Sequence, residues 1–158
     1  MTEEKIVDLS KNFAIEIINL CREIRENRNE KILVNQLLRS GTSIGANVHE
    51  ANYASSRADF INKLQIALKE CYETEYWLEI FQKTGYIELE EYKKFYADCS
   101  KIRKKISSVY HNSKTEFINI ATTNLWRSQQ FNSLSEAKIH ADACRQFTKG
   151  RAFQFTKK

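Results

Sequence analysis

The most restrictive feature of this sequence is the absence of proline from all 158 residues. Proline breaks helix interiors and marks turns, so a chain without it can form long, uninterrupted helices. Only four glycines occur, which is fewer than the many turns of a β-sandwich normally need. Hydrophobic residues make up 42% of the chain, which is enough to build a buried core. The composition therefore favours an all-helical protein.

Apolar residues recur every three or four positions in four segments, which is the spacing of one buried helix face. These segments cover about residues 4–27, 30–53, 56–84 and 88–111. The third has the clearest pattern, because its spacings of four and three match the seam of left-handed helix packing. That seam is Phe60, Leu64, Ala67, Cys71, Thr74, Leu78 and Phe81. A stripe on the fourth segment is Leu89, Tyr92, Tyr96, Cys99, Ile102, Ile106 and Val109. We predict an all-α, antiparallel up-down-up-down four-helix bundle over residues 1–112, with a C-terminal extension.

The third segment also carries signals for both of its ends. Ser55 or Ser56 is suited to cap its first turn, and Asp59 follows Ser56 by three residues, as in a capping box. Gly85 matches the glycine that often ends a helix.

The middle of the second segment, residues 39–47, is a poor helix former. One interpretation is a loop that splits the helix in two. The other is one continuous helix whose small residues let a second backbone approach closely. Leu37 and Ile44 lie seven residues apart, so the apolar stripe stays in phase across the interruption. We therefore favour the continuous helix.

The net charge of +5 is distributed unevenly along the chain. Up to Asn112 there are 17 basic and 17 acidic residues, and from Ser113 there are 8 and 3, which together give the totals of 25 and 20. We interpret residues 113–158 as a basic, weakly ordered tail outside the bundle, with a short helix at 133–147 that Ser133 and Glu136 would cap. A basic tail on a neutral body often contacts polyanions.

No pattern typical of an active site or a metal site is present. No Glu-x-x-His pair, HExxH motif, CxxC pair or phosphate-binding glycine loop occurs. We expect no catalytic, cofactor-binding or metal-binding residue, and we expect that the protein is not an enzyme. A metal-binding bundle enzyme is the least favoured alternative, and it would require convergence of His49, Glu50, Glu70 and Glu73.

The sequence also bears on the cellular compartment. The four cysteines, Cys21, Cys71, Cys99 and Cys144, lie far apart in apolar helical patterns, as reduced and buried thiols of a cytoplasmic protein do. No apolar run is long enough to span a membrane, and no signal peptide is visible. We therefore expect a soluble, cytoplasmic protein without a membrane partner.

Two surface features suggest partners. The apolar faces are wider than a lone bundle would bury, and Tyr76, Trp77 and Tyr86 add to this surplus, which favours a homo-oligomer. The fourth segment carries a run of cations that could bind the phosphates of RNA, although a solvated basic face is the simpler interpretation. These candidate nucleic-acid contacts are Lys94, Lys101, Arg103, Lys104 and Lys105, of which Lys94, Lys101 and Lys105 share a helix face.

The stretch from Gln36 to Glu50, QLLRSGTSIGANVHE, is the most distinctive part of the sequence, together with Ser55-Ser56 and Asp59-Phe60. It resembles the signature of the four-helix-bundle proteins encoded in intervening sequences of 23S ribosomal RNA. Residues 66–70 and 74–78 also fit the third helix of that family. The resemblance covers about residues 5–111. It implies structural roles for Arg39, Ser43, Gly45, Asn47, Glu50, Asp59 and Phe60.

The resemblance also implies a fold and a kind of function. The family is bacterial, adopts an up-down four-helix bundle, forms ring-like pentamers and has no established enzymatic activity. A distant relative is the accessory protein of diversity-generating retroelements, a basic pentameric barrel thought to engage nucleic acid and a reverse transcriptase. We therefore expect a non-enzymatic, self-assembling bundle that binds RNA or scaffolds an RNA-linked process. The alternative is a module that recruits another protein. The neutral bundle departs from that distant relative, and the tail after Asn112 matches neither.

Overall fold

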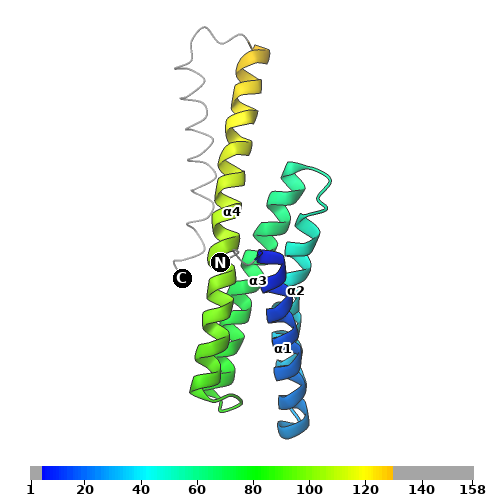
Figure 1. Ribbon diagram of the computed structural model, residues 1–158, viewed down its shortest axis with the longest axis vertical. Helices are drawn as coiled ribbons and strands as arrows, with labels where there is room; N and C mark the ends of the chain where they lie inside the picture. The colour runs from blue at the N-terminus through cyan, green and yellow to red at the C-terminus, as the bar shows by residue number, and fades with distance from the viewer. Residues whose placement is uncertain (1–4, 130–158) are drawn as a thin grey trace. The chain divides into compact units, whose positions relative to one another are not determined.

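The structure is a computed structural model that describes residues 5–129 of the chain (Figure 1). Four α-helices account for most of this range: α1 (Ile6–Arg28), α2 (Ile32–Ala51), α3 (Arg57–Lys83) and α4 (Leu89–Gln129). No strand occurs among the described residues. The all-α prediction is therefore confirmed. None of the helices in this range is both long and apolar enough to cross a membrane.

The helices of residues 5–112 alternate in direction, as Figure 1 shows. α2 packs against both α1 and α3. α4 completes the bundle by contacting both α1 and α3. The ring of Phe95 meets Phe13 of α1 with centroids 6.4 Å apart, and the Cys99 thiol lies 3.6 Å from the Cys71 carbonyl of α3. The predicted up-down-up-down four-helix bundle is confirmed.

The end of the fourth helix was predicted incorrectly. The chain divides into two units between Asn112 and Ser113, and the bundle is the first. α4 begins in the bundle but continues beyond His111, the predicted end, to Gln129. Residues 113–129, which we expected to be weakly ordered, are therefore helical. No proline or glycine interrupts this stretch, so nothing local ends the helix. The predicted helix at 133–147 lies outside the described residues.

All four helices contribute to one core. The largest side chains with almost no exposure are Ile17, Leu37, Ile44, Leu78, Phe81, Ile102 and Ile106. The predicted seam of α3 is buried along its length, with Phe60 half-buried at its start. On α4 the predicted stripe is partly wrong, because Phe95 and Tyr110 are buried whereas Tyr96 and Val109 are exposed. Spacings of three and four are both helical, so the sequence could not choose between Phe95 and Tyr96.

The second helix is continuous, as predicted, and the reason is close packing against α1. A Cβ atom added to Gly41 would lie 2.9 Å from the Ile17 side chain, and one on Gly45 would lie 3.1 Å from the backbone oxygen of Ser10. These glycines let the two helices approach closely, at a cost in helix propensity that the packing offsets.

The helix ends use local hydrogen bonds. Ser56 caps α3 by accepting a hydrogen bond from the Asp59 backbone N–H, and Asp59 accepts one from Ser55. Gly85 ends the turn after α3 with a φ of 74°. The cap of α2 was not predicted: the Glu30 carboxylate accepts hydrogen bonds from the N–H groups of Ile32 and Leu33. These bonds, chiefly the one from Leu33, lower the pKa of Glu30.

Candidate functional site

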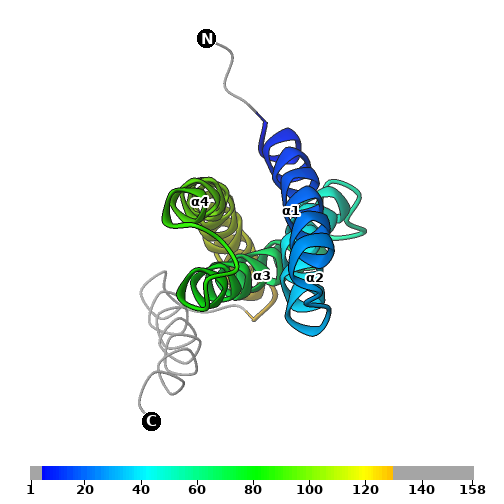
Figure 2. The ribbon, with the colours of Figure 1, turned by 90° about the horizontal axis from the view of Figure 1, so that it is seen from below.

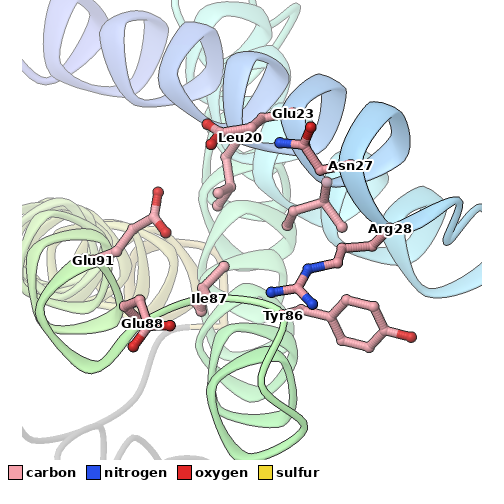
Figure 3. Close-up of a pocket in the computed structure, with 9 residues that line it drawn as sticks. Leu20, Glu23, Asn27, Arg28, Tyr86, Ile87, Glu88 and Glu91 are labelled. Carbon is pink, nitrogen blue, oxygen red and sulfur yellow. The ribbon is translucent and has the colours of Figure 1, made fainter.

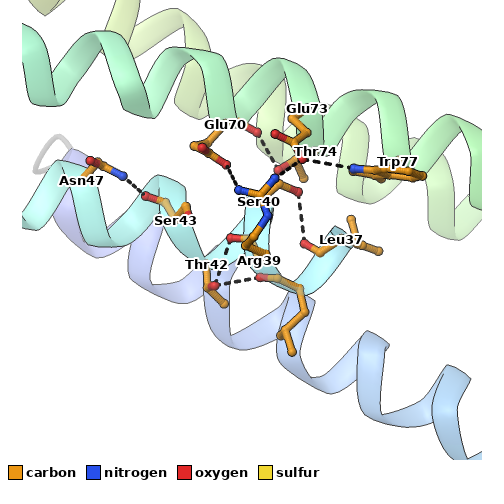
Figure 4. Close-up of polar contacts among 11 residues, drawn as sticks. Leu37, Arg39, Ser40, Thr42, Ser43, Asn47, Glu70, Glu73, Thr74 and Trp77 are labelled. Carbon is orange, nitrogen blue, oxygen red and sulfur yellow. Dashed lines mark hydrogen bonds and ion pairs between the residues drawn. The ribbon is translucent and has the colours of Figure 1, made fainter. Parts of the chain in front are cut away.

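The signature residues of α2 form a polar network with α3, shown in Figure 4. Arg39 donates a hydrogen bond to Glu73, and its guanidinium lies 3.7 Å from the carboxylate of Glu70. The indole N–H of Trp77 also points to Glu73, at 3.4 Å. Glu73 is therefore engaged by two side chains. These contacts link the signature residue Arg39 of α2 to the polar face of α3.

The Glu70 carboxyl group is the most confined member of this network. Its side chain is mostly buried, and this burial raises its pKa, which Arg39 partly offsets. A carboxylate that loses water in this way needs its cationic partner to remain ionised. The network therefore depends on Arg39 for its charge balance.

Small hydroxyl side chains lie beside the network and bond within their own helices. The Ser40 hydroxyl donates to the Leu37 carbonyl at 3.2 Å, and the Thr74 hydroxyl donates to the Glu70 carbonyl at 2.8 Å. The amide of Asn47 donates to the carbonyl of Ser43 at 2.9 Å. These hydrogen bonds pair each polar side chain with a backbone carbonyl of its own helix, so that each has a partner without the neighbouring helix.

The remaining signature residues stabilise the α2–α3 hairpin. Glu50 forms an ion pair with Lys63 of α3, Asp59 contributes to the cap of α3, and Phe60 packs against the core. His49 stacks near Tyr53, with ring centroids 5.2 Å apart. Within residues 5–129, no group of three or more His, Cys, Asp or Glu side chains is arranged to hold a metal ion.

The predicted basic patch on α4 is divided between two sides of the helix. Lys94 forms an ion pair with Glu16 of α1 at 2.8 Å, and Lys101 lines a shallow groove on that same side. Arg103 points the other way: its Nε donates to Glu75 of α3 at 2.8 Å, and its guanidinium lies 5.0 Å from the centre of the Tyr72 ring. The five cations therefore do not form one surface.

The remaining two members of the predicted patch differ in exposure. Lys104 is exposed, whereas Lys105 is half-buried. The pKa of both Lys94 and Arg103 is raised, chiefly by the hydrogen bond to the partner carboxylate. Both cations are thus held charged and already neutralised within the bundle.

An open pocket of about 440 Å³ lies where α1 ends beside the turn between α3 and α4 (Figure 3). Its polar lining includes Glu23 and Arg28 from α1 and Glu88 and Glu91 from the opposite side. Burial raises the pKa of Glu91, and the charges of Glu23 and Glu88 add to this effect. The pocket is acidic and open, unlike the enclosed and mostly apolar clefts that bind small ligands.

Two exposed apolar faces lie on different pairs of helices. On α1, Ile15 and Ile18 are 49% and 39% exposed, and Ile18 shares a groove of about 300 Å³ with Leu38 of α2. On α3, Tyr72 and Tyr76 are 58% and 54% exposed. We call the first the α1–α2 face (Ile15, Ile18 and the half-buried Leu38). The second is the α3–α4 face: Tyr72 and Tyr76 of α3, with Tyr96 and Leu89 of α4, which share a helix face with Arg103, the residue that lies over Tyr72. Exposed apolar side chains that share one face are candidate contacts for another protein chain.

The fold and these surfaces together define the class: a small helical bundle with exposed apolar groups, in which polar contacts join neighbouring helices. The sequence matches the family described as 23S rRNA-intervening sequence protein over residues 2–108, and the chain belongs to that family. The predicted resemblance is therefore confirmed. The match ends before the second unit begins.

The chain is also similar to a solved protein. This is a protein of unknown function from the S23 ribosomal protein family of Bacteroides thetaiotaomicron VPI-5482, whose crystal structure was determined at 1.70 Å. The two are 49% identical with a TM-score of 0.66, over 67% of this chain and 98% of that one. No curated protein matches the sequence.

Proposed function

We propose that this protein is a non-enzymatic assembly unit whose bundles associate through their apolar faces into a closed ring, and that the assembly binds RNA. The proposed assembly rests on the presence of two exposed apolar faces on one bundle. The bundle residues carry 17 basic and 17 acidic side chains, so no net charge opposes the approach of a second copy.

The placement of the faces favours a ring over a simple dimer. Figure 2 shows α1 and α2 on one side of the bundle and α3 and α4 on the other. If the α1–α2 face of one copy packs on the α3–α4 face of the next, each added copy leaves one face of each kind open. Such head-to-tail contacts continue until the rotation closes a ring. The resemblance to the family favours five subunits.

Light scattering of the purified full chain tests the assembly. We expect a defined multiple of the 18.5 kDa chain mass. Ile18→Asp should disable one face and Tyr76→Asp the other, so each variant alone should run as a monomer. Mixed together, the two variants should form a dimer, because each retains the face that the other lacks. Asn27→Asp adds the same charge on the opposite side of α1, at an exposed position nine residues from Ile18, and should leave the assembly unchanged.

A wild-type chain that stays monomeric at micromolar concentration would rule out the assembly. If each variant alone formed a dimer, the faces would pair like with like, and the ring geometry would be wrong. A mixture that remained monomeric while wild type assembled would show that the two faces do not pair with each other.

RNA binding is supported by the link to ribosomal RNA in the family description and by the excess of basic residues in the chain. Fluorescence anisotropy with a labelled RNA hairpin, in increasing salt, tests it. We expect the logarithm of the binding constant to fall linearly with the logarithm of the salt concentration. Assembly without any salt-sensitive RNA binding would instead favour a module that recruits another protein.

A further inference from the structure

We infer that the contact between neighbouring copies is centred on a cation–π pair, in which Arg22 at the edge of the α1–α2 face of one copy stacks on the Tyr76 ring in the α3–α4 face of the next. This inference rests on the assembly proposed above and names the residues that join its two faces. Three observations support it: an unpaired arginine on the first face, exposed tyrosine rings on the second, and an arginine–tyrosine contact that the second face already contains.

The first observation concerns the edge of the α1–α2 face. Arg22 is exposed and lines the groove that Ile18 shares with Leu38, and it lies one helical turn from Ile18. Its neighbour Arg25 donates a hydrogen bond to Asn35. The Arg22 guanidinium, in contrast, forms no ion pair within residues 5–129. The face therefore offers a neighbouring copy a groove with an uncommitted cation beside it.

The second observation is the exposure of tyrosine rings on the α3–α4 face. More than half of Tyr72 and of Tyr76 is exposed. The Tyr76 ring meets Trp77 at an interplanar angle of 72°, so these two rings do not stack face to face. Tyrosine is enriched at the centres of protein interfaces, because its ring buries a large area and has few rotatable bonds. Tyr76 is therefore suited to be an anchor for another chain.

The third observation is that this face already holds a guanidinium on a tyrosine ring. The Arg103 guanidinium lies 5.0 Å from the centre of the Tyr72 ring, within the range of a cation–π interaction. Tyr76 lies one turn further along α3, and no cation of the described residues lies over its ring. A guanidinium from a second copy on Tyr76 would repeat the arrangement of Arg103 on Tyr72.

A second copy suits Arg22 better than an anion does. Glu26 lines the same groove, one turn from Arg22, and its negative charge opposes the approach of a phosphate. A tyrosine ring carries no net charge and attracts a guanidinium through its electron-rich face. Arg22 and Tyr76 of one bundle belong to helices on different sides of it, as Figure 2 shows for α1 and α3, so the contact requires two copies.

The mixed pair of Ile18→Asp and Tyr76→Asp chains tests this contact, because their dimer contains one α1–α2 face on one α3–α4 face. Adding Arg22→Gln to the Tyr76→Asp chain should weaken the dimer about tenfold, and adding Tyr76→Leu to the Ile18→Asp chain should have a similar effect. The matched controls are Arg28→Gln in the first chain and Tyr53→Leu in the second, which should change the dissociation constant by less than about twofold. Sedimentation velocity over a concentration series measures these constants.

A double-mutant cycle tests whether the two residues contact each other. With Arg22→Gln in one chain and Tyr76→Leu in the other, the total loss should stay near about tenfold, whereas independent changes would multiply to about a hundredfold. Tyr76→Phe should keep the affinity within about twofold, because the ring remains. Multiplying losses, or a loss with Tyr76→Phe as large as that with Tyr76→Leu, would overturn the stacking of Arg22 on the ring.

The outcomes separate this inference from the proposed function. If the mixed pair dimerises and Arg22→Gln weakens it no more than Arg28→Gln does, the inference is wrong and the assembly stands. If wild type assembles but the mixed pair does not, the inference fails together with the ring geometry. A monomeric wild-type chain overturns both the inference and the assembly. Circular dichroism should show unchanged helicity in every variant, since the changed side chains are exposed, and a loss of helicity with Tyr76→Leu would leave the decision to the Arg22 variant and Tyr76→Phe.

Discussion

Where α1 meets α2, small residues bring the two helices close together, whereas where α3 meets α4, a charged pair links the two helices beside the close contact of Cys99 with Cys71. In the first seam, a Cβ added to Gly45 would lie 3.1 Å from the backbone oxygen of Ser10. In the second, Arg103 reaches across to Glu75 at 2.8 Å and covers the ring of Tyr72. The α1–α2 seam is therefore most sensitive to added side-chain volume, which lowers the free energy of unfolding. The α3–α4 seam is most sensitive to the loss of a charged partner.

The largest effect is expected from added volume in the α1–α2 seam. Gly45→Val should lower the free energy of unfolding by about 3 kcal/mol, because the new side chain meets α1 backbone, which cannot move aside like a flexible side chain. Ala46→Val makes a similar change at the next, exposed position and should cost only about 0.5 kcal/mol. Urea unfolding followed by circular dichroism measures both. Equal costs would show that the close approach of α1 and α2 is not a constraint.

An intermediate effect is expected from the charged pair of the α3–α4 seam. Arg103→Gln should cost about 2 kcal/mol, because it leaves the buried Glu75 carboxylate without its cation. The side chains of this pair are 22% and 10% exposed, whereas those of Lys94 and Glu16 are 61% and 41% exposed. Lys94→Gln should therefore cost less than about 0.5 kcal/mol.

A double variant sharpens this prediction. Arg103→Gln combined with Glu75→Gln should be more stable than Arg103→Gln alone, because no unpaired carboxylate remains. If the double variant were the less stable of the two, the arginine would act through its packing on Tyr72, and the ion pair would be secondary.

The smallest effects are expected at the turns that join each pair of helices. Backbone hydrogen bonds lower the pKa of Glu30, so its contribution to stability is present above about pH 4.5 and is lost as the pH falls through the lowered pKa. Burial raises the pKa of Glu91, so its ionised form disfavours folding near neutral pH, and this penalty disappears as the pH falls through the raised pKa.

Urea unfolding of two glutamine variants at several pH values tests these opposite signs. Near neutral pH, Glu30→Gln should be less stable than wild type, and Glu91→Gln should be more stable by roughly 0.5 kcal/mol. Both differences should shrink in acid, where the wild-type carboxyls are protonated. A Glu91→Gln variant less stable than wild type at neutral pH would mean that the carboxylate is engaged by a favourable partner.

The sequence predicted features that depend on neighbours along the chain. The seam of α3, the cap at Ser56 and the glycine turn at Gly85 follow from helical spacing and local hydrogen bonds, and all three are present. The continuity of α2 through Gly41 and Gly45 was also predicted, because the stripe keeps its phase there. The length of α4 was not predicted, since the apolar pattern fades after His111 although no helix-breaking residue follows.

By itself, then, the sequence determined the helical class, the order of the helices, the family signature and the division of charge at Asn112. The tertiary structure decided which ring of α4 enters the core, Phe95 rather than Tyr96, and which carboxylates meet Lys94 and Arg103. The physical reason is that helical period fixes only which residues share a face of one helix. Pairing between helices depends on their relative rotation and shift, which close contacts such as Gly45 against Ser10 set through the packing of the whole bundle.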